Sequence, residues 1–200
     1  MTAPRPHDLL FALRPDAFAV DGARPDWLDA RAPLVVRRES TAAGIVPVGA
    51  RGLQRNERCK GYLTLDAVAS VITLRILATR AHGADGALPC IAALRGLAPR
   101  LDALDIEWGP VGGAGYWLAC GLPVLRATSD LDLLVRLPRR PAAGVLKTLT
   151  ALHDGQPCRI DIQIDTGVGG FALAEFARGG RVLLKTDAGP RLVDDPWEAA

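Results

Sequence analysis

The sequence predicts an α/β protein of the α+β type, in which a mixed sheet with flanking helices forms the C-terminal part and a smaller α+β domain precedes it. Three observations support this prediction. From about residue 106, strand-like and helix-like stretches alternate in the order β-α-β-α-β-α-β, which is typical of an α/β domain. Within that part, "CRIDIQID" (158–165) alternates strictly between apolar and polar residues, as a strand does. A Gly-rich break, "RAHGADGALP" (80–89), separates it from an N-terminal part with a different pattern.

The N-terminal part is expected to form a domain of residues 1–84, and residues 85–200 a second domain. A chain of 200 residues is long enough for one large domain or two small ones. The stretches 32–40 and 44–52 indicate short strands separated by a turn. Residues 62–77 allow two interpretations, because their apolar spacing fits a helix whereas their β-branched residues suit strands.

The elements expected after the break follow from apolar spacing. A helix is indicated by apolar residues that recur every three or four positions, and Pro99 is expected to kink or restart it. The members of that stripe are Ile91, Leu94, Leu97, Leu101 and Leu104. The later expected elements are a strand at 105–109, a turn at 110–115, a helix at 115–121, a strand at 130–136, a helix at 142–155, a strand at 158–165, a helix at 169–180 and a strand at 181–186.

Composition and charge exclude several classes of protein. A net charge of +2 is too small to indicate a nucleic acid or an anionic membrane as the partner. The four cysteines and three histidines are scattered, without a CxxC pair, which argues against a zinc site and a disulfide scaffold. No apolar run reaches the roughly 18 residues of a membrane span, and the first residues do not read as a signal peptide. We therefore expect a cytoplasmic protein with no nucleic acid and no membrane as partner.

The stretch "RATSDLDLLVRLP" places Asp130 and Asp132 at the start of an otherwise apolar strand. Side chains two residues apart on a strand point to the same face, with Cβ atoms on the order of 7 Å apart. Two such carboxylates can bind one divalent cation between them, or one each in a two-metal site. In the later strand "RIDIQID", Asp161 shares a face with Gln163 and Asp165, and it completes a three-carboxylate cluster if the two strands pair. A cluster of carboxylates favours Mg²⁺ over zinc, and we expect two ions.

A Gly-rich turn, "GPVGGAGYW", lies upstream of the carboxylates. Amides at Gly112 and Gly113 can hold phosphate oxygens, aided by the dipole of the helix that follows. Each motif alone is weak, because Asp-x-Asp at a strand end more often caps a turn or faces water, and Gly-Gly turns are common. The combination of a glycine turn, a helix, a strand with Asp-x-Asp and a later strand with a third Asp indicates a nucleotidyltransferase site. The expected C-terminal fold is accordingly nucleotidyltransferase-like.

Several stretches resemble a known family, the malonate decarboxylase holo-acyl-carrier-protein synthases, also called phosphoribosyl-dephospho-CoA transferases. Three of them lie in the C-terminal part: "WGPVGGAGYWLACGLPVLRATSDLDLLVRLP", "RIDIQIDTGVGGFALAEFARGG" and "VLLKTDAGPRLVDDPW". "RPHDLL" and "GIVPVGARGLQRNERCKGYL" are similar to the family's N-terminal part. The resemblance covers nearly the whole chain and is densest after residue 106.

The resemblance implies a function. The family transfers the 5-phosphoribosyl-dephospho-CoA prosthetic group from 2′-(5-triphosphoribosyl)-3′-dephospho-CoA to a serine of the apo acyl-carrier subunit of malonate decarboxylase, releasing pyrophosphate. By this resemblance, Asp130 and Asp132 are the metal-binding pair, Asp161 is the third carboxylate, and Gly112-Gly113 is the phosphate-holding turn. One departure is that the motif usually has serine at the position of Gly113. The backbone amide remains, so the turn can still bind phosphate.

Four basic side chains are candidates to bind the phosphates of the donor. Arg136 and Lys185 lie on or at the ends of expected strands, and a solvated strand end is an equally good account of Arg136. Arg51 and Arg58 belong to a basic stretch of the N-terminal domain. That stretch either meets the adenosine or pantetheine part of the donor or has a structural role only, and its Gly and Pro turns favour the structural role.

Other assignments stay open. His7 and Asp8 have the composition of a catalytic dyad, but an Asp at the start of a helix is the simpler interpretation. Arg136, Arg139, Arg140 and Arg178 are candidates for a basic rim that meets an acidic carrier protein. The alternative functions are another Mg-dependent nucleotidyltransferase, which adenylylates a small molecule or a protein, and a non-catalytic nucleotide-binding protein. The presence of all three carboxylates argues against the second.

Overall fold

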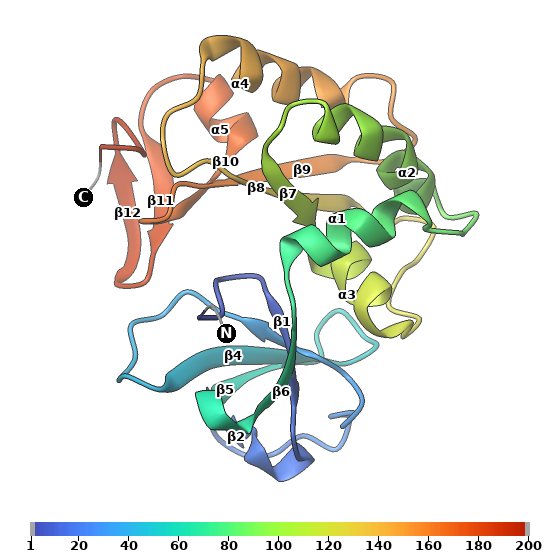
Figure 1. Ribbon diagram of the computed structural model, residues 1–200, viewed down its shortest axis with the longest axis vertical. Helices are drawn as coiled ribbons and strands as arrows, with labels where there is room; N and C mark the ends of the chain where they lie inside the picture. Colours follow the sequence, from blue (N-terminus) through green and yellow to red (C-terminus); the bar gives the residue numbers. More distant parts are fainter. Residues whose placement is uncertain (1–2, 199–200) are drawn as a thin grey trace.

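The computed structural model describes residues 3–198 and confirms a mixed α/β fold, with two separate six-stranded sheets and, within those residues, five α-helices (Figure 1). The chain crosses from the first sheet to the second at Thr73, between β6 (Val68–Ile72) and α1 (Leu74–His82). The Thr73 side chain accepts a hydrogen bond from the Ile76 amide, which caps α1. The Gly-rich break at 80–89, where the domain boundary is expected from the sequence, instead connects α1 to α2 (Pro89–Asp102).

The N-terminal sheet is antiparallel throughout, in the order β2-β5-β4-β3-β1-β6. The strands expected at 32–40 and 44–52 are confirmed as β3 and β4. Residues 62–77 contain both of the structures that the sequence allowed. The end of β5 and the whole of β6 are strands, and the start of α1 is helical. The other elements of this half are β1 (Leu9–Ala12), η1 (Pro15–Ala17), β2 (Ala19–Val20), β3 (Leu34–Val36), β4 (Ile45–Arg51), β5 (Arg58–Thr64) and η2 (Leu65–Ala67).

The C-terminal sheet has the order β12-β11-β10-β9-β8-β7, in which β8 and β9 are parallel and the other neighbouring strands are antiparallel. The expected alternation of strands and helices is confirmed, and the short strands β10 and β12 are additions to it. The elements are β7 (Glu107–Pro110), α3 (Gly112–Cys120), β8 (Leu131–Arg136), α4 (Ala143–Thr150), η3 (Ala151–His153), β9 (Ile160–Asp165), β10 (Gly170–Ala172), α5 (Leu173–Ala177), β11 (Val182–Thr186) and β12 (Gly189–Val193).

The two faces of the C-terminal sheet differ in their side chains, because one face is apolar and buried and the other carries polar residues. On β8 and β9, alternate apolar side chains are buried in one core with α2, α4 and α5, which cover the face away from the N-terminal half (Figure 1). These side chains are Leu131, Leu133, Val135, Ile160, Ile162 and Ile164. The period of two along a strand then directs the intervening polar residues toward the N-terminal half. The fold therefore places the carboxylates of both strands at the junction of the two halves.

Two local expectations need correction. The helix α2 continues through Pro99 to Asp102, because the apolar stripe of this helix is buried in the core while Pro99 itself is exposed. The helix α3 begins at Gly112, so the glycines form its first turn and not a separate turn before it. None of the helices in residues 3–198 has the length and apolarity needed to cross a bilayer.

Candidate active site

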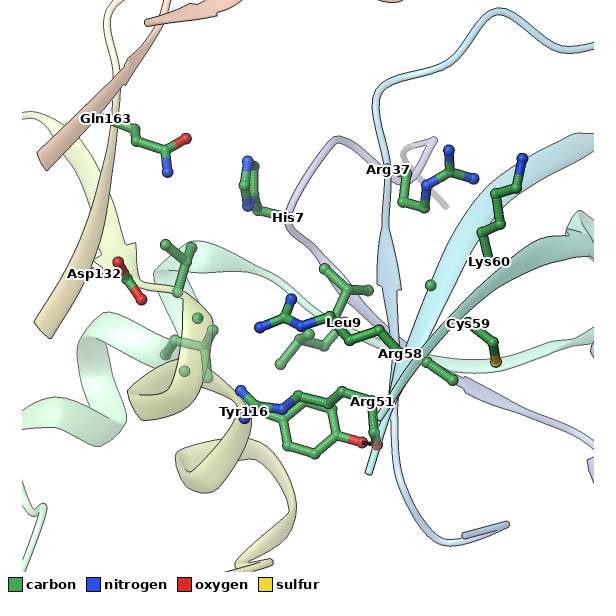
Figure 2. A pocket seen from close by; sticks show the side chains of 17 residues that line it. His7, Leu9, Arg37, Arg51, Arg58, Cys59, Lys60, Tyr116, Asp132 and Gln163 are labelled. Atoms are coloured by element: carbon green, nitrogen blue, oxygen red, sulfur yellow. Dashed lines mark hydrogen bonds between the residues drawn. The ribbon is translucent and has the colours of Figure 1, made fainter. Parts of the chain in front are cut away.

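A cavity of about 600 Å³ lies between the two halves and is lined by both (Figure 2). The charged side chains that the N-terminal half contributes are all basic: Arg37, Arg51, Arg58 and Lys60, and His7 lies beside them in the lining. The C-terminal half contributes Gly112, Tyr116, Asp132 and Gln163. In Figure 2 the carboxylate of Asp132 faces the arginines across the open space. The cavity thus combines cations from one sheet with a carboxylate and a helix start from the other.

Of the three carboxylates predicted from the sequence, Asp132 lines this cavity, whereas Asp130 and Asp161 do not. Asp132 and Asp161 are register partners on the parallel strands β8 and β9, and Asp130 directly precedes β8. Arg159 donates two hydrogen bonds to Asp161, at 3.0 and 3.2 Å. In the part of the chain that the structure describes, Asp132 forms no ion pair. Burial raises the pKa of Asp132 to about 6, and the negative charges of Asp161 and Asp130 add to this effect.

The donor atoms fit a hard divalent cation, since they are all carboxylate oxygens. Within residues 3–198, however, no group of three or more His, Cys, Asp or Glu side chains is gathered in a metal-binding arrangement. What the structure brings together is the pair Asp132 and Asp161, with Asp130 near enough to raise the pKa of Asp132. Metal binding by the three carboxylates therefore stays a prediction, supported by the uncompensated charge on Asp132.

The glycine turn and the carboxylate are in direct contact. Gly112 has a φ of +56°, and a Cβ atom at this position would lie 2.0 Å from Oδ2 of Asp132. Only glycine fits there without displacing the carboxylate. A Cβ atom at Gly113 would lie 3.8 Å from Nη1 of Arg51. The first turn of α3, the carboxylate of β8 and an arginine of β4 therefore meet at one place.

Arg51 and Arg58 are directly opposite each other on β4 and β5, and both line the cavity. Like charges in this position destabilise a sheet unless an anion lies between or beside them. In residues 3–198 neither guanidinium forms an ion pair, and Nε of Arg51 is buried without a hydrogen-bond partner. The Arg51 guanidinium lies 5.3 Å from the ring centroid of Tyr116, whose hydroxyl donates to the Arg51 carbonyl (3.1 Å). Burial and the charge of Arg58 lower the pKa of Arg51. The pair is thus fixed in place and suited to an anionic ligand.

The structure corrects the expectation that Arg136 binds phosphate. Its side chain is 5% exposed and does not line the cavity. It contacts Asp8 (3.2 Å), Glu107 (3.0 Å) and Asp165 (3.6 Å), so its charge is already neutralised by carboxylates. Lys185 is exposed on β11 and is not among the residues that line the cavity.

His7 was not predicted as part of the site, yet its side chain lines the cavity. The residue adopts a left-handed backbone conformation with φ of +71°, and its amide donates to the Val36 carbonyl (2.9 Å). Burial and the charge of Arg38 lower the pKa of His7 to about 4. The expectation that Asp8 begins a helix is wrong, since it directly precedes β1 and accepts a hydrogen bond from the Arg5 amide. The only sequence signal was the His-Asp pair in "RPHDLL".

Three of the four arginines expected at a carrier-binding rim lie elsewhere on the surface, and the fourth, Arg136, is buried. Arg140 forms an ion pair with Asp195, and its guanidinium lies 5.0 Å from the ring centroid of Trp197. Arg139 and Arg178 are exposed. None of the three arginines lines the cavity. Their contact with a carrier protein stays a prediction.

Comparison with known proteins gives a consistent result along the chain. The family model described as phosphoribosyl-dephospho-CoA transferase MdcG N-terminal domain matches residues 5–73, and that of the C-terminal domain matches residues 75–196. The two matches meet where the chain passes from one sheet to the other. Proteins named phosphoribosyl-dephospho-CoA transferase are similar over the full length. That of Pseudomonas putida strain W619 is 46% identical, covering 98% of this chain and 97% of its own. The relative from Pseudomonas aeruginosa is 42% identical, over 98% of this chain and 95% of its own length. The relative from Klebsiella pneumoniae is 37% identical, over 98% of this chain and 97% of its own length. No solved structure matches the chain significantly.

Proposed function

This chain belongs to the phosphoribosyl-dephospho-CoA transferase MdcG family and is a transferase, and on that premise we propose a specific reaction for it. The enzyme moves the 5-phosphoribosyl-dephospho-CoA unit from 2′-(5-triphosphoribosyl)-3′-dephospho-CoA to a serine of an apo acyl-carrier protein. The observation that carries this proposal is the cavity between the halves, where Gly112 and Asp132 face two arginines that form no ion pair within residues 3–198.

The reaction is a substitution at the innermost phosphorus of the donor's triphosphate. A bond forms between this phosphorus and Oγ of the carrier serine, and the bond to the bridging oxygen breaks, so that pyrophosphate leaves. The serine hydroxyl gives up its proton. Charge builds on the departing pyrophosphate, and catalysis of this type depends on positioning and on electrostatic stabilisation.

The residues of the cavity supply both the positioning and the electrostatic stabilisation that the reaction needs. The amides of the first turn of α3, including that of Gly113, hold phosphate oxygens at the positive end of the helix dipole. Arg51 and Arg58 bind the phosphates from the opposite wall, since neither has a carboxylate partner in the described residues. Both arginines come from the N-terminal half, which explains why the catalytic half alone does not complete the site.

Asp130, Asp132 and Asp161 would hold Mg²⁺, which when bound neutralises charge on the phosphates. Asp132 is the central member, because it lines the cavity and has no cation paired to it in residues 3–198. Burial, together with the negative charges of Asp161 and Asp130, raises the pKa of Asp132, and a divalent ion bound there would offset these effects. Asp161 also accepts two hydrogen bonds from Arg159, so that its charge is partly offset already.

The acceptor we propose is the apo acyl-carrier subunit of malonate decarboxylase. The name shared by the relatives specifies the group transferred and is compatible with such an acceptor. The carrier's serine must reach the reacting phosphorus in a cavity that already holds a large anionic donor. A serine on an exposed or mobile segment of the carrier meets this requirement.

The experiment that tests the function is transfer to the carrier with Asp130→Asn and Asp132→Asn, compared with the wild type. We expect each variant to lose transfer by about 10²–10³-fold, as when one electrostatic stabiliser is removed from such a site. Thermal unfolding measured in parallel is expected to show intact folds. Asp154→Asn, at an exposed position outside the cavity, is the matched control.

A second arm offers ATP in place of the triphosphoribosyl-dephospho-CoA. Transfer from ATP but not from the larger donor would replace the proposed function by adenylylation. Near-normal transfer by either Asn variant would remove the carboxylates from the mechanism.

A further inference from the structure

The proposed transfer requires a group that takes the proton of the carrier serine. Most side chains that line the cavity cannot do so, because the arginines and the lysine are protonated donors without a free lone pair. Burial raises the pKa of Tyr116, whose hydroxyl already donates to the Arg51 carbonyl. Burial also raises the pKa of the Cys59 thiol. Of the titratable side chains lining the cavity, Asp132 and His7 remain.

The carboxylates are poorly placed for this task. Asp132 has a role as ligand of the cation in the proposed function, and its contact with Gly112 fixes it against α3. Asp161 does not line the cavity, and its Oδ1 accepts hydrogen bonds from both Nε and Nη2 of Arg159. His7 is therefore the remaining lining side chain that can accept the proton.

The backbone of His7 is fixed beside the cavity by its own hydrogen bond and by those of the next residue, Asp8. Its backbone occupies the left-handed region, which few non-glycine residues adopt and which marks a position fixed by its surroundings. The amide of His7 is bonded to Val36, and the next residue, Asp8, is bonded to the Arg5 amide and to Arg136 of β8. In residues 3–198 the imidazole itself forms no hydrogen bond. Figure 2 shows it projecting into the cavity, toward the side where Asp132 and Gln163 lie.

The charges around His7 keep its imidazole neutral and free to accept a proton. Arg38, Arg136 and Lys185 each lower the pKa of His7, while Asp165 raises it, and burial adds the largest lowering effect. A bound triphosphate brings negative charge to the same region and opposes these cations. The donor thereby stabilises the imidazolium that forms when the proton arrives.

We propose that the His7 imidazole is the proton acceptor of the transfer, an inference that rests on the proposed function. As the bond between the serine Oγ and the innermost phosphorus forms and pyrophosphate leaves, the hydroxyl proton passes to an imidazole nitrogen. After the products leave, the imidazolium returns the proton to solvent. The N-terminal segment would then be a catalytic element, anchored through Asp8 and Arg136 to the strand that carries Asp132.

The test compares His7→Asn with the wild type in single-turnover transfer to the carrier. Asn tolerates the left-handed backbone at this position, so the fold should be retained. We expect the rate of transfer to fall by about 10²–10⁴-fold, the usual contribution of a general base, with the donor's KM changed less than about twofold. Binding of dephospho-CoA, measured by calorimetry, should be unchanged. His153→Asn, outside the cavity, is the matched control and should transfer normally.

The pH dependence of the transfer rate distinguishes a proton acceptor from a residue with a structural role only, because loss of a structural residue would not change this dependence. For the wild type, the rate with bound donor should fall as the pH drops below the pKa of the imidazole, and His7→Asn should lose this fall. A normal rate in His7→Asn, an unchanged profile, or a loss confined to the donor's KM would each overturn the proposal while leaving the proposed function intact. A wild type inert toward the triphosphoribosyl donor would overturn both, and normal binding of dephospho-CoA would show that the protein was folded.

Discussion

Gly112 and Asp132 are separated in sequence by a helix and a loop, yet their atoms are in contact. A Cβ atom at Gly112 would lie 2.0 Å from Oδ2 of Asp132, and φ at Gly112 is +56°. The glycine therefore serves two purposes, since it allows a left-handed start of α3 and leaves room for the carboxylate. The neighbouring Gly113 has neither constraint, because its nearest contact is the end of the flexible Leu125 side chain at 2.9 Å.

This difference gives a prediction for two adjacent Gly→Ala changes. Gly112→Ala should destabilise the protein by at least about 1–2 kcal/mol, the cost of a left-handed non-glycine residue, because the methyl group also meets the carboxylate. Transfer should fall by about 10²-fold, since a displacement of 1 Å at a reacting site has such an effect. Gly113→Ala is the matched control and should retain most of the activity. Thermal unfolding and single-turnover transfer measure both effects, and equal behaviour of the two variants would contradict the prediction.

The residues that the sequence could identify are those whose chemistry is local. Asp130 and Asp132 form a recognisable spacing on an apolar strand, and Gly112-Gly113 precede it in a recognisable order. The environment of Arg136 could not be predicted, because it depends on Asp8, which is far away in the sequence. For the same reason His7 was recognised only as half of a possible dyad.

The elements follow the sequence best where one face of a strand is buried. The strict alternation of "CRIDIQID" predicted β9 closely, and the apolar run after Asp130 predicted β8. The short strand β12 (Gly189–Val193) was missed, since its side chains are mostly exposed and leave no apolar period to detect. Residues 62–77 remained ambiguous because a strand and a helix follow each other there with only Thr73 between them.

The parallel pair β8–β9 also determines how the two halves are joined. Asp165 at the end of β9 contacts Arg38 of the N-terminal half (2.8 Å), and Arg136 at the end of β8 contacts Asp8 (3.2 Å). These side chains are between 3% and 12% exposed, so the ion pairs are shielded from water. Removing one partner from a buried pair leaves an uncompensated charge, which costs about 3–5 kcal/mol.

We therefore expect Arg136→Met to reduce the free energy of unfolding by roughly 3 kcal/mol, because Asp8 loses its cation while Asp165 keeps Arg38. Methionine retains much of the side chain's volume, so the loss reports charge more than packing. Arg139→Met removes an exposed arginine three residues further along and should change stability by less than about 0.5 kcal/mol. Urea unfolding of both variants measures the difference. A stability of Arg136→Met within error of the wild type would mean that the buried pair contributes nothing to the joining of the halves.

At the scale of the whole molecule, the cavity lies where two sheets meet with complementary charges. The N-terminal sheet provides cations and the C-terminal sheet provides the carboxylate of Asp132, whereas the net charge of the chain is only +2. Composition therefore indicated nothing about this separation of charge. The two groups at the junction with large pKa shifts in opposite senses are His7, lowered to about 4, and Asp132, raised to about 6.

These two shifts act in opposite directions on stability between pH 4 and pH 6. For His7 the unfolded chain binds the proton more tightly, because its ordinary pKa is 6.5, so its contribution to stability falls as the pH drops below 6.5 toward 4. For Asp132 the folded protein binds the proton more tightly, because the ordinary pKa is 3.8, so its contribution rises as the pH drops below about 6. In the wild type the two contributions largely cancel.

Single substitutions should separate them, in metal-free buffer. Asp132→Asn retains only the His7 contribution. When the pH is lowered from 7 to 5, the free energy of unfolding of this variant should therefore change by roughly 1–2 kcal/mol in the destabilising direction, compared with the change in the wild type. His7→Asn retains only the Asp132 contribution, and its free energy of unfolding should rise by a similar amount relative to the same reference. Urea unfolding at the two pH values, with His153→Asn as the control, measures both changes. The opposite signs are the decisive feature, because a general effect of acid on the fold would move both variants in one direction. Parallel curves for the two variants would show that His7 and Asp132 do not titrate as their surroundings at the junction of the two sheets require.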